Sequence, residues 1–186
     1  MSQSDTSRVI LKGEISRAYN LNYQPDEVFT YISDLKVLYS NVPYATKIQL
    51  RKNSGRARLF CTVNVLGVEA RALIDVEPTI NQQERTIRMG SPAEPLGPIP
   101  PGYMTGTFTS LLRVTSNDKG GTRTAARIAL AFDARQVELL NYFSRSFLET
   151  AAQPLLQQRV DDLCTDYVVK LLEGLAGRYK QRQPQS

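Results

Sequence analysis

The sequence predicts one α+β domain, in which a curved antiparallel sheet of about seven strands wraps around a long C-terminal helix. Three observations support this class. Apolar and polar residues alternate through most of residues 44–133, which is the two-residue period of strands. Short turn-like segments separate these runs, as in a meander of consecutive antiparallel strands. Over residues 136–175 the apolar residues recur at helical spacing instead.

The N-terminal part is predicted to form one strand and two short helices. Residues 9–23 alternate in the manner of a strand. Pro25 suits the first position of a helix, where Asp26 and Glu27 are favourable near the positive end of the dipole. The helical region is expected to end before Pro43, because proline disfavours helical backbone in the residue that precedes it.

The meander and the terminal helix follow. Strands are expected at residues 44–51, 58–65, 68–76 and 86–89 and in a hairpin over residues 106–133. An uninterrupted helix over residues 136–175 would be about 60 Å long at 1.5 Å per residue. We expect it to bend or restart at Pro154, which lacks the N–H of the helical ladder. Gly174 and Gly177 are expected to end it.

Composition indicates an ordinary globular protein. The 186 residues are 41% hydrophobic and 22% charged, which fits a single domain. We expect a flexible N-terminus (residues 1–7), the domain (8–176) and a basic disordered tail (177–186). The N-terminus lacks signal-peptide character, and no apolar run approaches the roughly 18 residues of a membrane helix. The predicted location is cytoplasmic, with peripheral membrane association left open.

Residue usage narrows the chemistry. The sequence has no histidine, so the usual general base and the commonest zinc ligand are missing. Cys61 and Cys164 lie far apart in apolar patterns, where a thiol usually behaves as a small buried hydrophobe. No phosphate-binding glycine loop or metal-type spacing is present. We therefore expect no cofactor, no metal and no catalytic residue.

Two segments carry a resemblance to a known family. Residues 23–35 (Tyr-Gln-Pro-Asp-Glu-Val-Phe-Thr-Tyr-Ile-Ser-Asp-Leu) resemble the opening strand-to-helix step of the START-like superfamily of polyketide cyclases, dehydrases and lipid-transport proteins. Residues 128–132 resemble its exit strand into the terminal helix. The resemblance covers residues 8–175 and implies a helix-grip fold. It leaves the activity open, because the superfamily includes carriers, enzymes and co-chaperones.

The resemblance implies an apolar cavity between the sheet and the helix. Small residues in the inward strand phase, such as Ala126 and Ser110, would leave volume there, although an ordinary packed core is the alternative. The candidate ligand-binding residues are Tyr31, Val63, Ala70, Ala72, Met89, Ile99, Tyr103, Phe108, Leu130, Phe143 and Phe147.

Residues 91–103 form a proline-rich loop, which cannot be a central strand. One interpretation is a semi-rigid lid beside the cavity mouth, with Ile99 and Tyr103 touching ligand or partner. The other is a spacer that covers the sheet edge.

The outward strand phase is basic, in keeping with a net charge of +5. It is either a solvated face or a docking surface for an anionic membrane or an acidic protein. Nucleic acid is not expected, because only Phe60 could stack on bases there. The candidate partner-binding residues are Arg51, Arg58, Arg71, Arg88, Arg113 and Arg127.

These features leave three functional hypotheses. The leading hypothesis is a carrier or sensor of a hydrophobic small molecule, such as a lipid, quinone, isoprenoid or pigment. The second is an interaction module that uses the basic face. The third is a cyclase- or dehydrase-like enzyme, against which the missing histidine counts.

Overall fold

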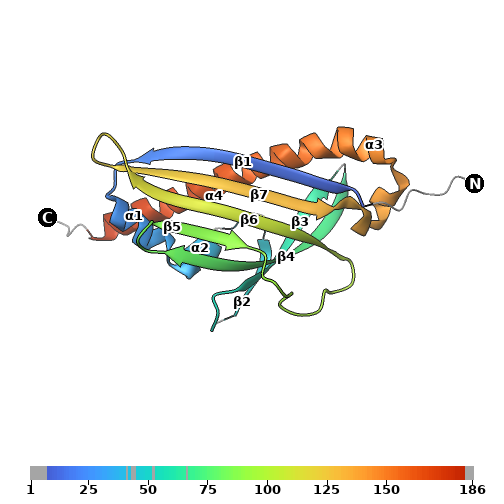
Figure 1. Ribbon diagram of the computed structural model, residues 1–186, viewed down its shortest axis with the longest axis horizontal. Helices are drawn as coiled ribbons and strands as arrows, with labels where there is room; N and C mark the ends of the chain where they lie inside the picture. Colours follow the sequence, from blue (N-terminus) through green and yellow to red (C-terminus); the bar gives the residue numbers. More distant parts are fainter. Residues whose placement is uncertain (1–7, 41, 43–44, 52, 66, 183–186) are drawn as a thin grey trace, which may run out of the picture.

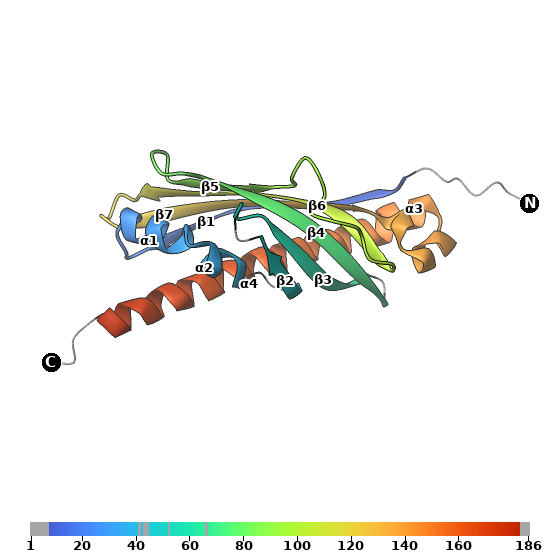
Figure 2. The same cartoon turned by 90° about the horizontal axis from the view of Figure 1, so that it is seen from below.

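The computed structural model describes residues 8–40, 42, 45–51, 53–65 and 67–182 (Figure 1). In this part of the chain seven strands form one sheet in the order β1-β7-β6-β5-β4-β3-β2. The sheet curves over helix α4 (Gln153–Arg182), which lies along one of its faces (Figure 2). The predicted α+β class is confirmed.

The strands lie where the alternating pattern placed them, with longer ends. They are β1 (Ile10–Leu21), β2 (Ala45–Leu50), β3 (Ala57–Val65), β4 (Val68–Asn81), β5 (Thr86–Gly90), β6 (Tyr103–Ser116) and β7 (Thr122–Asp133). Neighbours pair antiparallel. Because β5 is short, β4 and β6 also meet beyond its end in a brief parallel pairing of residues 71–73 with 103–105.

Two short helices follow β1, as expected. Helix α1 (Pro25–Ile32) has proline at its first turn and a capping box between Gln24 and Glu27. Helix α2 (Leu35–Ser40) begins after Asp34, whose carboxylate accepts the Lys36 N–H at 2.9 Å. The predicted boundary at Pro43 lies outside the described residues.

The C-terminal segment differs from the expectation at its start. Its first residues form two 3₁₀ turns rather than helix, η1 (Ala134–Gln136) and η2 (Glu138–Tyr142). Helical backbone begins with α3 (Arg145–Phe147) and passes through a π-helical turn, η3 (Leu148–Ala152), into α4. This wider turn immediately precedes Pro154, so the chain passes the missing N–H by changing its hydrogen-bond pattern.

The helix also ends later than expected. Helix α4 continues through Gly174 and Gly177 to Arg182, so neither glycine is a cap and residues 177–182 are helical. Gly174 serves close packing instead, because a Cβ there would overlap the Tyr31 hydroxyl. Gly174 therefore allows a close contact between α4 and α1.

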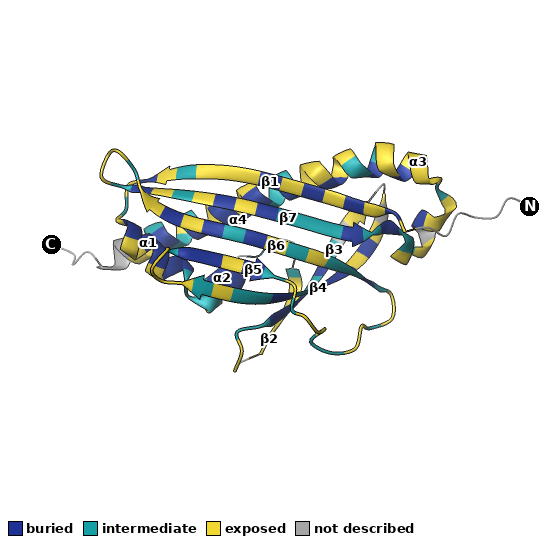
Figure 3. Ribbon diagram, in the orientation of Figure 1, coloured by how far each residue is buried: buried dark blue, intermediate teal, exposed yellow. Residues whose placement is uncertain are grey.

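Burial alternates along the strands (Figure 3). The face toward α4 carries the core, and the other face is largely exposed. The free edge of β1 is covered by α4: the Gln157 amide donates to Glu14 O and accepts from Glu14 N, at 2.6 and 3.0 Å. Gln153 contacts Lys12 in the same way. At Lys12 and Glu14, backbone groups that could pair with another strand are thus satisfied internally.

None of the helices in the described part of the chain combines the length and the apolar character that a bilayer crossing requires.

Candidate functional site

A cavity of about 360 Å³ lies between the sheet and α4. The sheet supplies most of its wall, and α4 closes the other side with Leu156, Val160 and Leu163. Ala72 and Gly106 leave space where larger side chains would fill it. The main apolar side chains contributed by the strands are Leu59, Ile74, Val76, Met89, Met104, Phe108, Leu112, Ile128, Leu130 and Phe132.

Two tyrosines in the wall are held by backbone carbonyls. The Tyr39 hydroxyl donates to Gly55 O at 2.9 Å, and the Tyr167 hydroxyl donates to Leu38 O at 3.1 Å. Burial raises the pKa of Tyr39 to about 12 and also raises the pKa of Tyr167. Both tyrosines are therefore neutral near pH 7, and each hydroxyl proton is already used in a hydrogen bond to a backbone carbonyl.

The Cys61 thiol also faces the cavity. Burial raises its pKa to about 11, so it is a protonated, poorly nucleophilic thiol near pH 7. Cys164 is buried elsewhere along α4, where burial likewise raises its pKa.

Ser110 is a polar side chain within the apolar part of the sheet wall. It is 7% exposed, lies on β6, and pairs directly with Met89 on β5 and Ile128 on β7. Its hydroxyl has no hydrogen-bond partner. A buried hydroxyl without a partner is uncommon in a folded protein.

The rim of the cavity is exposed and mostly polar. It includes Asn64 and Glu69 from the β3–β4 hairpin, and Leu155 and Arg159 from α4. Glu69 lies 3.7 Å from Arg71, an exposed ion pair. The cavity therefore reaches the surface between this hairpin and the first turns of α4.

Four of the predicted ligand-binding residues, Ala72, Met89, Phe108 and Leu130, line this cavity. Ala70 is buried in β4 but is not part of the wall. The side chain of Val63 lies outside what the structure describes. Strand alternation found the sheet wall because side-chain direction follows position directly in a strand.

The remaining predicted ligand-binding residues lie away from the cavity, which corrects those assignments. Tyr31 packs against α4 beneath Arg178, whose guanidinium carbon is 4.7 Å from the ring centroid. Phe143, after η2, and Phe147, in α3, stack on each other with their ring centroids 5.0 Å apart. Tyr103 meets Phe60 edge to face on the outer side of the sheet.

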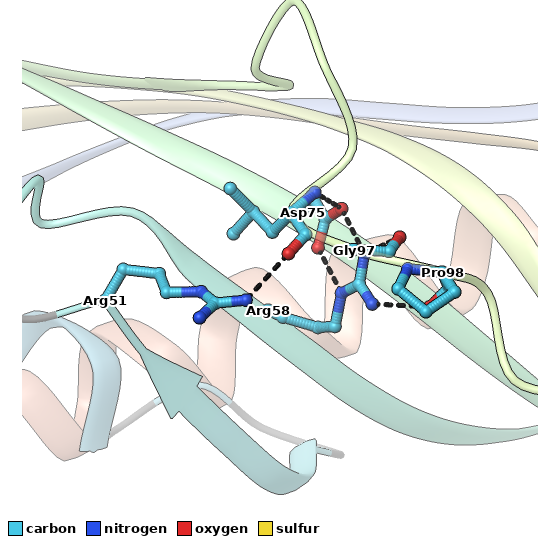
Figure 4. Close-up of polar contacts among 6 residues, drawn as sticks. Arg51, Arg58, Asp75, Gly97 and Pro98 are labelled. Carbon is cyan, nitrogen blue, oxygen red and sulfur yellow. Dashed lines mark hydrogen bonds and ion pairs between the residues drawn. The ribbon is translucent and has the colours of Figure 1, made fainter.

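The proline-rich loop lies on the outer face of the sheet, so the expectation of a lid beside the cavity mouth is wrong. Figure 4 shows how it is held: Arg58 donates to Gly97 O and Pro98 O, and Leu96 N donates to Asp75. Ile99 faces a separate groove between the loop and the outer face. The loop covers part of the outer face of the sheet, whereas the alternative interpretation placed it over the sheet edge.

The basic face is also smaller than the sequence indicated. Arg58 is 6% exposed and bound to Asp75, so it is not available to a partner. Arg51 donates to Leu96 O in the same loop. The other four predicted residues are exposed; Arg71 and Arg127 form ion pairs with Glu69 and Glu14. Arg88 and Arg113 have no ion pair among the described residues.

The helix side of the cavity could not be predicted from the sequence pattern. Helical periodicity marked an apolar stripe on α4 without showing which of its residues face the cavity. Ser110 was recognised only as a small inward residue, although a serine between inward Phe108 and Leu112 was the available signal. The described residues contain no cluster of three or more Cys, Asp or Glu that could hold a metal.

A curved antiparallel sheet closed by a C-terminal helix over an apolar cavity defines a helix-grip protein, the class that the resemblance implied. A conserved protein from Geobacillus kaustophilus has this fold, with 13% identity, a TM-score of 0.59, and coverage of 90% of this chain and 96% of that chain. So does the Zhui aromatase/cyclase from Streptomyces sp. R1128, with 14% identity, a TM-score of 0.51, and coverage of 94% and 97%.

The fold also occurs in StfQ, a di-domain aromatase/cyclase from the steffimycin biosynthetic pathway. Identity is 9% and the TM-score is 0.58, and the match covers 91% of this chain and 52% of StfQ. At these identities the likeness concerns the fold. No protein-family model and no curated protein sequence matches the chain.

Proposed function

We propose that this protein binds a hydrophobic small molecule in the cavity between its sheet and α4, as a carrier or sensor. The observation that carries the proposal is the cavity itself: about 360 Å³ of space behind a wall of aliphatic, aromatic and sulfur-containing side chains. Interiors normally close to the density of organic crystals, so retained apolar volume of this size favours a ligand.

The size and the polarity of the cavity limit which ligands it could hold. Ligand pockets run from roughly 300 to 1,000 Å³, so this cavity suits a small molecule rather than a lipid with two acyl chains. Burial of its apolar surface would supply the affinity, at roughly 25 cal/mol per Å² removed from water. The charged rim residues Glu69 and Arg159 would face only the exposed end of the ligand.

The test is native mass spectrometry of the purified protein, followed by solvent extraction and identification of any released molecule. A stoichiometric apolar molecule would support the proposal and give its chemical class. A protein of apo mass, with no thermal shift across a panel of quinones, isoprenoids and aromatic compounds, would overturn it.

A pair of matched variants makes this test specific to the cavity. Ala72→Phe places a ring in the cavity and should abolish ligand retention. Ala129→Phe places the same ring on the outer face of β7 and should leave retention unchanged. Equal retention by both variants would mean that the bound molecule lies elsewhere. Thermal unfolding of each apo variant checks that it is folded.

A cyclase-like activity is the second candidate, favoured by the shared fold with aromatase/cyclases. In the part of the wall that the structure describes, charged side chains lie at the rim, and the Tyr39 and Tyr167 hydroxyls are engaged with carbonyls. In a cyclase, these groups or Ser110 would have to act as the general acid or base. Conversion of a bound compound to a product of different structure would favour it over carriage.

A further inference from the structure

Ser110 has the properties of a ligand anchor. Its side chain is more than nine-tenths buried, lines the cavity, and has no hydrogen-bond partner at its hydroxyl. Its cross-strand neighbours Met89 and Ile128 and its same-strand neighbours Phe108 and Leu112 face the same cavity. The hydroxyl is thus an isolated polar group on an apolar surface.

Packing alone does not account for a serine here. A buried hydroxyl that lacks a partner destabilises the folded state relative to alanine, whose side chain would fit the same space. An ordered water is a poor substitute, because a buried water needs two to four polar partners and the neighbouring side chains are apolar. The unmet hydrogen-bonding capacity is therefore available to a ligand.

The charge distribution defines what kind of ligand group Ser110 could meet. The charged side chains of the described wall, Glu69 and Arg159, lie at the exposed rim. A carboxylate or phosphate beside Ser110 would be buried without a counter-charge, which is strongly unfavourable. A neutral oxygen would gain a hydrogen bond there instead.

We propose that Ser110 anchors a neutral, largely apolar ligand through a hydrogen bond to a hydroxyl or carbonyl oxygen of that ligand. This inference rests on the proposed function, since it requires that the cavity be occupied. It narrows the ligand class to phenols, alcohols, ketones or quinones with a ring or isoprenoid skeleton of a size that fits about 360 Å³.

The experiment compares two probes of the same shape, 2-naphthol and 2-methylnaphthalene, by titration calorimetry. Each is bound to the wild-type protein, to Ser110→Ala, and to Ser16→Ala as a control on the exposed outer side of β1. The ratio of the two dissociation constants measures the contribution of the ligand oxygen to binding, since the hydrophobic contribution is nearly the same for both probes.

We expect Ser110→Ala to reduce the relative preference for 2-naphthol by about two- to tenfold, the usual value of one net hydrogen bond. Binding of 2-methylnaphthalene should stay the same or tighten, and Ser16→Ala should behave as wild type. If both probes bind and Ser110→Ala leaves their ratio unchanged, the anchor is refuted while the carrier function stands. If neither probe binds the wild-type protein and its native mass is also that of the apo form, both proposals fail.

Discussion

Arg58 and Asp75 face each other across strands β3 and β4 and form a two-point ion pair. The Arg58 Nε and a terminal guanidinium nitrogen donate to the two carboxylate oxygens at 2.7 and 2.9 Å. Both groups also form hydrogen bonds with the proline-rich loop: Asp75 accepts from Leu96 N, and Arg58 donates to Gly97 O and Pro98 O (Figure 4). This pair therefore fastens a segment of irregular backbone to the outer face of the sheet.

Removal of Arg58 alone should be strongly destabilising, because the buried Asp75 carboxylate then loses the guanidinium that balances its charge and keeps the Leu96 N–H as a donor. We expect Arg58→Met to lower the free energy of unfolding by about 3–5 kcal/mol, measured by urea denaturation. Arg58→Met with Asp75→Leu should recover much of this loss, since no charge is left unpaired. Arg88→Met, on an exposed arginine, should change stability by no more than about 0.5 kcal/mol. Equal losses from the Arg58 and Arg88 variants would refute the anchoring role.

The same pair makes a prediction about acid stability. Burial by itself raises the pKa of Asp75, but the hydrogen bonds from Arg58 and Leu96 outweigh it and hold the pKa below the ordinary value of 3.8. The folded carboxyl thus stays charged at a pH where the unfolded one is protonated. Its contribution is fully present above about pH 3.8 and is lost as pH falls through the folded pKa.

The measurement is the stability difference between wild type and Asp75→Asn from pH 6 to pH 3. It should stay constant down to about pH 4 and shrink below that, since acid then removes from wild type the charge that the variant already lacks. A difference that declines above pH 5 would contradict the assignment.

Gly13 allows α4 to approach the edge of the sheet. A Cβ on Gly13 would lie 2.5 Å from Val160 Cγ2 and 3.2 Å from Leu156 O. Gly13→Ala should therefore destabilise the protein by about 1–3 kcal/mol in thermal or urea unfolding. Adding Val160→Ala should relieve part of this clash. Gly90→Ala is the control, because no atom lies within 4 Å of its added Cβ; a similar loss there would remove the steric explanation.

The strands could be predicted well because period-two alternation depends on local side-chain direction and one buried face. Pro25 and the acidic residues after it placed α1 for an equally local reason. The prediction that Gly174 ends the helix was wrong, because a glycine at a helix cap and a glycine at a close contact look alike in sequence. Only the position of Tyr31 against α4 separates the two.

The site was predicted less completely, since it depends on how distant elements meet. Ala72 and Leu130 were found because they follow the inward phase of the sheet. The position of the proline-rich loop could not be found in this way. It is set by Arg58, which the alternation marked only as outward-facing and which the loop then buries.

Cys61 provides a probe of the cavity that is independent of any bound molecule found in the purified protein. Its thiol faces the cavity and burial raises its pKa to about 11, so its reaction with methyl methanethiosulfonate should be slow at pH 7. In a Cys164→Ala variant we expect the rate to rise about tenfold per pH unit between pH 7 and 9, in step with the thiolate fraction. Saturating 2-naphthol should slow it, whereas Cys164 in a Cys61→Ala variant should be unaffected. A rate that levels off near pH 9, or that does not change when naphthol is added, would mean that the reagent reaches Cys61 from solvent by a route other than the cavity.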